Sequence, residues 1–86
     1  MDPADFDRHM KLAERNVTFF PNIRIIVVRD GYGETVRVID AMRLAAAWLT
    51  MSNDDFFVRY GFNWVPPTEL QDEVRRNAVR GGRYGT

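Results

Sequence analysis

The stretch that decides the fold runs from residue 54 to residue 67 and reads Asp-Asp-Phe-Phe-Val-Arg-Tyr-Gly-Phe-Asn-Trp-Val-Pro-Pro. Five of the chain's eleven aromatic residues fall within it, namely Phe56, Phe57, Tyr60, Phe62 and Trp64. Large rings dominate the energetics of protein cores and of protein interfaces. A segment this rich in rings is therefore expected to be buried in the fold or against a partner, with the rest of the chain as its scaffold.

The size of the chain predicts a thin core. Its 86 residues make one small domain, and the absence of cysteine excludes disulfides and thiolate-held metals as a means of stabilising it. The aromatic content of 13% compensates, because each ring buries a large area for little loss of side-chain entropy. We expect one compact domain over residues 1–80 and a flexible C-terminal tail over residues 81–86.

The charge is balanced, with 12 basic and 12 acidic residues. A neutral chain lacks the broad positive field that draws proteins to nucleic acids or acidic membranes. No apolar run approaches the ~18 residues of a membrane helix, and Met1-Asp2-Pro3 is acidic where a signal peptide would be basic. We therefore expect a cytoplasmic protein without membrane contact. Lys11 is the only lysine among the 12 basic residues, and all the others are arginine. Such a preference for arginine is expected of an accessory protein from a GC-rich bacterium or its phage.

The first half of the chain predicts a helix followed by a β-hairpin. Asp2 and Pro3 are typical of a helix start, and a helix is expected over residues 3–15, with one apolar stripe formed by Phe6, Met10, Ala13 and Val17. Residues 17–20 favour extended structure, which Pro21 is expected to end. The strand over residues 23–29 and the return strand over 35–39 are joined by Asp30-Gly31-Tyr32-Gly33, a sequence typical of a turn.

The second half predicts three helices, capped at their N-termini by Asp40, Ser52 and Thr68. Gly61 and Gly81 are expected to end the last two. Residues 62–67 should be extended, because each proline disfavours helix at the residue before it. The predicted fold is a single small α+β domain with a β-hairpin packed against about four helices, in the order α-β-β-α-α-α.

The chain offers little material for catalysis or metal binding. Ser52 is the only serine and is explained by helix capping, and nothing in the sequence brings it near His9, the only histidine. Asp5, Asp7 and His9 lie close in sequence, but one histidine without further nitrogen or sulfur ligands makes a poor zinc site. We predict a non-enzymatic protein with no catalytic residue, no metal and no cofactor.

The aromatic segment carries the main functional hypothesis. If residues 53–60 are helical, Phe57 points about 100° away from the face that holds Phe56 and Tyr60. So small a domain is not expected to hide Phe57, Phe62 and Trp64 together, although the alternative that all three belong to the core stays open. We predict a protein-binding module whose partner-binding patch consists of Phe57, Arg59, Phe62, Asn63, Trp64 and Val65.

Two other functions stay open. The basic C-terminal region predicts a nucleic-acid-binding accessory protein that uses Arg75, Arg76, Arg80 and Arg83, although the neutral charge of the chain argues against it. The apolar strand over residues 23–28 predicts a homo-oligomer or self-assembling subunit, because a free hairpin edge can pair with its copy in a second chain.

Overall fold

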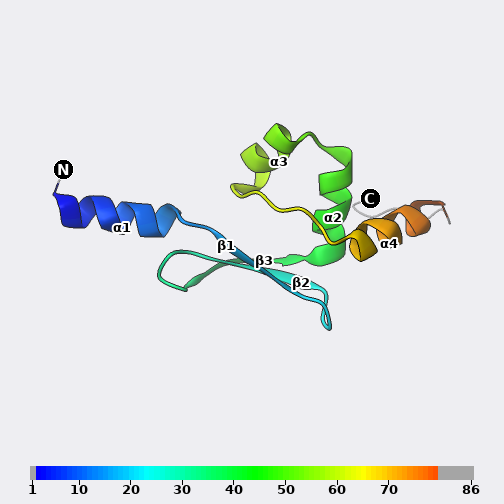
Figure 1. Cartoon of the computed structure of the whole chain (residues 1–86), viewed down its shortest axis with the longest axis horizontal. Coiled ribbons are helices and arrows are strands. Elements are labelled where there is room, and N and C mark those ends of the chain that lie inside the picture. Colours follow the sequence, from blue (N-terminus) through cyan, green and yellow to red (C-terminus); the bar gives the residue numbers. More distant parts are fainter. Residues whose placement is uncertain (1, 80–86) are drawn as a thin grey trace. The chain divides into compact units, whose positions relative to one another are not determined.

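The computed structural model describes residues 2–79 (Figure 1). Its elements are α1 (Pro3–Ala13), β1 (Asn16–Phe20), β2 (Ile25–Arg29), β3 (Thr35–Asp40), α2 (Ala41–Thr50), α3 (Asn53–Tyr60) and α4 (Thr68–Val79). The predicted α+β class is confirmed, and the sheet contains one strand more than the expected hairpin. Within residues 2–79, no helix has the length and apolar character needed to cross a membrane.

The chain groups into two compact units, Met1–Ile39 (the N-terminal unit) and Asp40–Thr86 (the C-terminal unit). The first holds α1 and most of the sheet, and the second holds the three remaining helices. A single domain over residues 1–80 stays a prediction. The expected flexible tail over residues 81–86 lies outside the described residues.

The sheet has the strand order β1-β2-β3, so β2 is the central strand. The additional strand, β1, pairs antiparallel with β2, with Asn16 opposite Arg29 and Phe20 opposite Ile25. Pro21 ends β1 as expected, but the chain then reverses instead of continuing. The backbone N–H of Arg24 donates to the Phe20 carbonyl at 2.8 Å, and Arg24 has a φ of 54°, in the left-handed region. Ile23, expected in a strand, lies in this loop and is 65% exposed.

A buried aspartate organises the turn between β2 and β3. The Asp30 residue is 7% exposed, and its Oδ1 accepts hydrogen bonds from the backbone N–H groups of Tyr32 (2.9 Å) and Glu34 (3.1 Å). The adjacent Gly31 N–H donates to the Lys11 carbonyl at 2.7 Å, and a Cβ at Gly31 would lie 2.9 Å from the Lys11 Cα. The turn therefore contacts the C-terminal end of α1, and glycine is needed at this close approach.

Asp40 and Ser52 cap the N-termini of α2 and α3, whereas Thr68, predicted as the cap of the last helix, is itself the first residue of α4. Asp40 Oδ1 accepts from the backbone N–H of Arg43 at 3.0 Å, and Ser52 Oγ accepts from that of Asp55 at 3.1 Å, so both predicted caps are confirmed. Gly61 ends α3 in the left-handed conformation, with a φ of 80°.

The core of the C-terminal unit forms where α2 packs against α3 and α4. Its buried apolar residues are Ala41, Met42, Leu44, Ala45, Phe56, Phe62, Leu70 and Val74. The reversal at Gly61 brings Phe62 beside Phe56, with ring centroids 6.0 Å apart in an edge-to-face arrangement, and Tyr60 lies 4.8 Å from Phe56. Three rings of the aromatic segment therefore form one cluster, which fixes the extended chain that follows α3.

Candidate functional site

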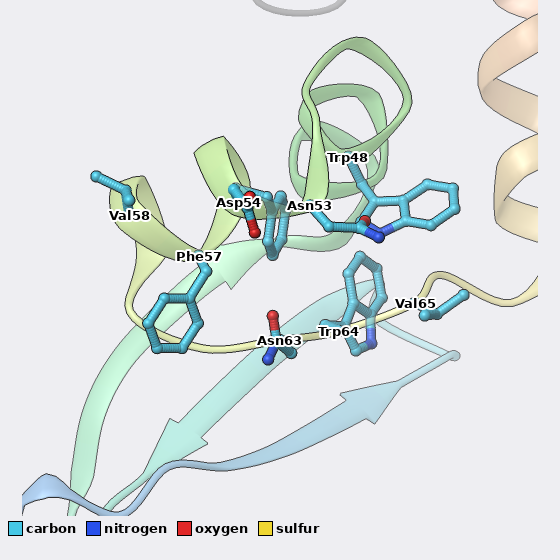
Figure 2. Close-up of a pocket in the computed structure, with 9 residues that line it drawn as sticks. Trp48, Asn53, Asp54, Phe57, Val58, Asn63, Trp64 and Val65 are labelled. Carbon is cyan, nitrogen blue, oxygen red and sulfur yellow. The ribbon is translucent and has the colours of Figure 1, made fainter.

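A pocket with a volume of about 640 Å³ opens in the C-terminal unit between α2, α3 and the extended segment that follows α3. We call it the aromatic pocket, and it is lined by Trp48, Asn53, Asp54, Phe56, Phe57, Val58, Asn63, Trp64 and Val65. In Figure 2, Trp48 comes from α2, while Phe57 and Trp64 come from the helix and the segment on either side of the opening. Its size lies within the range of known ligand sites.

Local structure places these side chains on the outer side of the core. The start of α3 after Ser52 directs Phe56 inward, and Phe57, the next residue, is consequently turned outward and is 49% exposed. After Gly61 the chain is extended, so side chains alternate: Phe62 is buried, whereas Asn63 and Val65 are exposed. The pocket therefore has a floor fixed by the ring cluster and a rim open to solvent.

The lining is mostly apolar, with one charge. Asp54 is the only ionisable residue among the lining residues, and it has no ion pair within residues 2–79. The amides of Asn53 and Asn63 are the other polar side chains of the lining. Trp48 and Trp64 are the only tryptophans of the chain, so all of its tryptophan fluorescence comes from side chains that line this pocket.

The structure brings together four of the six predicted patch residues, since Phe57, Asn63, Trp64 and Val65 all line the aromatic pocket. The expectation that at least one of the surplus rings stays exposed is confirmed by Phe57. Phe62, by contrast, is 4% exposed and packs against Phe56, so it supports the pocket from within the core. Whether the patch binds a partner stays a prediction.

Arg59, the remaining patch residue, lies in a different place. It lines a second pocket, of about 420 Å³, which we call the arginine pocket. The residues of this pocket are Arg43, Ala46, Ala47, Thr50, Met51, Arg59 and Tyr60. Arg59 thus belongs with Arg43 and not with the aromatic rim, where the sequence-based prediction had placed it.

Five lining residues of the aromatic pocket were not predicted as site residues. They are Trp48 on α2 and Asn53, Asp54, Phe56 and Val58 on α3. Trp48 is only partly buried, and α3 carries both polar residues into the pocket. Their exposure depends on how α3 lies against α2, which the helical spacing of each segment does not show.

Of the four arginines predicted to bind nucleic acid, the structure describes Arg75 and Arg76. Arg75 pairs with Asp72 at 3.5 Å, with both side chains more than half exposed, and Arg76 is exposed. Arg80 and Arg83 lie outside the described residues, so nucleic-acid binding stays a prediction. Because β2 is the central strand, residues 23–28 do not offer a free edge, and self-assembly through the hairpin would need β1 or β3.

The charged residues near the N-terminus lie on α1, which has no buried residue. In the part of the chain that the structure describes, no group of three or more histidine, aspartate and glutamate side chains could hold a metal ion. Asp5 forms an ion pair with Arg8, the residue one turn later on α1.

Comparison with protein-family models, with curated proteins and with solved structures finds no match to this chain.

Proposed function

We propose that the chain is a small, non-enzymatic protein-binding module whose aromatic pocket holds a side chain of a partner protein. The observation that carries this proposal is the lining of the pocket, in which the rings of Trp48, Phe57 and Trp64 surround one open space (Figure 2). Aromatic side chains supply much contact area and are enriched in the central, energetically dominant part of protein interfaces.

The rim of the pocket suits a protein better than a small molecule. Val58 is 83% exposed and Val65 is 68% exposed, so apolar surface continues from the pocket on to the neighbouring surface of the unit. A partner that inserts one side chain could cover both valines with its flanking residues. A small ligand held in the pocket would leave them in water, and the gain from burying apolar area would be smaller.

The segment that carries Trp64 and Val65 is held in place before binding. Pro66 is fully buried, and its carbonyl accepts a hydrogen bond at 2.8 Å from the Gln71 side-chain amide, whose residue belongs to α4. Proline also restricts the backbone of the residue before it. A segment that is already ordered loses less conformational entropy when a partner binds, which leaves more of the contact energy for affinity.

The residues that line the aromatic pocket indicate which type of side chain a partner would insert. The apolar walls favour an aromatic or branched aliphatic residue, and Asp54 favours a neighbouring lysine or arginine on the partner, because opposite charges attract most strongly where water is partly excluded. The two asparagines can donate to and accept from the partner's backbone. With Asp54 as its only ionisable group, the pocket lacks the acid and base pair that most hydrolytic or proton-transfer chemistry uses.

The proposal predicts a specific effect of Phe57→Ala. Peptides would be selected on the whole chain from a displayed random library, and their affinity measured by the fluorescence of Trp48 and Trp64. Phe57→Ala should weaken the binding of the selected peptides by at least about tenfold, because truncating a hot-spot ring at the centre of an interface costs about 2 kcal/mol or more. The matched control is Phe6→Ala, a ring of similar exposure (54%) in the N-terminal unit, which should leave affinity unchanged.

Two outcomes would contradict the proposal. One is a set of selected peptides that bind Phe57→Ala as tightly as the parent chain. The other is tight binding without any change in tryptophan fluorescence, which would place the binding surface elsewhere on the molecule.

A further inference from the structure

The arginine pocket lies on the side of α2 that faces away from the core. Arg43, Ala46, Ala47 and Thr50 are spaced by three, one and three residues, and thus share one helical face. The buried residues Ala41, Leu44 and Ala45 occupy the opposite face. The pocket is completed by Met51 and by Arg59 and Tyr60 at the end of α3. It is therefore a site separate from the aromatic pocket.

The charge of the arginine pocket is the reverse of that of the aromatic pocket. Arg43 and Arg59 contribute two guanidinium groups, and no acidic side chain is among the lining residues. Two like charges that line one small space repel each other, and the repulsion grows as water is excluded. An anion placed between them would convert this repulsion into two attractive interactions.

The common structural roles of arginine do not account for this pair. Elsewhere in the chain, Arg15 donates to the carbonyls of Leu12 and Glu14 at 2.7 and 2.8 Å, and Arg75 pairs with Asp72. Within residues 2–79, the guanidinium groups of Arg43 and Arg59 have no carboxylate or carbonyl partner. Arg59 lies over the ring of its neighbour Tyr60, with the guanidinium carbon 5.7 Å from the ring centroid.

Two backbone carbonyls in the last turns of α2 have donors other than arginine. The Thr50 hydroxyl donates to the carbonyls of Ala46 (3.2 Å) and Ala47 (3.1 Å), and the Met51 N–H also donates to Ala47 at 3.1 Å. The negative end of the α2 dipole is consequently in part satisfied within the helix. Neither of these two carbonyls therefore needs an arginine as its donor.

We propose that the arginine pocket binds a compact oxyanion, a carboxylate or a phosphate, between the guanidinium groups of Arg43 and Arg59. The planar fork of N–H groups on each arginine matches the oxygens of either anion and gives charge-assisted hydrogen bonds. Ala46, Ala47 and Met51 provide an apolar floor for the carbon atoms next to the anionic group. This site does not depend on the function proposed for the aromatic pocket.

The test uses the whole chain labelled for NMR spectroscopy. It is titrated with inorganic phosphate and, in a separate series, with acetate, each at constant ionic strength with chloride as the competing ion. Saturable shifts of the backbone amide signals of Arg43, Ala47 and Arg59 are expected in at least one series. Shifts with phosphate alone would identify a phosphate-bearing ligand, and shifts with acetate would identify a carboxylate.

Substitutions decide whether the two arginines hold the anion. Arg43→Gln and Arg59→Gln should each raise the dissociation constant at least about fivefold, because each removes one charge-assisted pair. Arg76→Gln, which removes an exposed arginine of α4 that does not line the pocket, should leave it unchanged. The proposal is wrong if neither anion gives saturable shifts, or if a chain with both substitutions binds as the parent does.

Discussion

Replacing Phe56 with alanine is expected to lower the free energy of unfolding of the C-terminal unit by about 3–5 kcal/mol. The ring is 2% exposed and contacts Tyr60 and Phe62, so its removal takes away buried apolar area and leaves a cavity between α3 and the segment after it. Urea unfolding followed by tryptophan fluorescence would measure the loss, because both tryptophans belong to this unit.

The adjacent ring supplies the control for this experiment. Phe57 is 49% exposed and lies on the rim of the aromatic pocket, so Phe57→Ala should cost less than about 1 kcal/mol. The two substitutions remove the same atoms from neighbouring positions. Equal losses would mean that Phe57 is part of the core in solution, and the aromatic pocket would then lack the exposed ring on which its proposed function depends.

Asp30→Ala is expected to destabilise the N-terminal unit by about 1.5–3 kcal/mol. The substitution removes the carboxylate that accepts hydrogen bonds from the N–H groups of Tyr32 and Glu34, and both N–H groups are partly buried. Hydrogen bonds to a charged acceptor contribute more than those between neutral groups, and the donors left behind would lose their partner. The effect should appear as faster amide hydrogen exchange at Tyr32, Glu34 and in β2.

Asp30→Asn is the matched variant for the turn. Its side chain keeps an acceptor oxygen in the same position but loses the charge, and so it should recover a substantial part of the stability that Asp30→Ala loses. If the alanine variant exchanged no faster than the parent chain, the turn would be held by the strand pairing and by the Gly31 contact with α1, and not by the Asp30 carboxylate.

Local signals in the sequence were sufficient for most of the helices. Asp2, Asp40 and Ser52 each occupy an N-cap position in the structure, and Gly61 ends α3 in the left-handed conformation as expected. These features depend on one side chain and on backbone groups within a few residues of it. A single segment therefore carries all the information that such a prediction needs.

The strand β1 was not predicted because its partner lies further along the chain. Residues 17–20 were recognised as β-prone, but Pro21 was taken as the end of extended structure, whereas it opens a tight loop into β2. That loop needs a left-handed residue, and the chain uses Arg24, which gives no signal of the kind that glycine would give. Pairing between strands is a tertiary property that propensity does not show.

The sequence was sufficient to predict which segment forms part of the candidate site. It was not sufficient to predict the full set of residues that line the pocket. The surplus of rings after Asp54 pointed to the segment that lines the aromatic pocket, and Phe57 is exposed as that surplus predicts. The spacing of the residues does not show that Phe62 turns inward, or that Arg59 lies with Arg43 in another pocket. Those placements follow from the crossing of α2 and α3, which depends on many side chains at once.

The most direct measurement for the central claim is an NMR titration of the whole chain with indole, a small aromatic probe that fits apolar pockets. If the aromatic pocket is open to a partner's ring, the side-chain Nε1–H signals of Trp48 and Trp64 should shift together and reach saturation as indole is added. Phe57→Ala should weaken the binding of indole. Shifts confined to the exposed apolar residues of the N-terminal unit, such as Phe6 and Ile23, or the absence of any saturable shift, would contradict the claim.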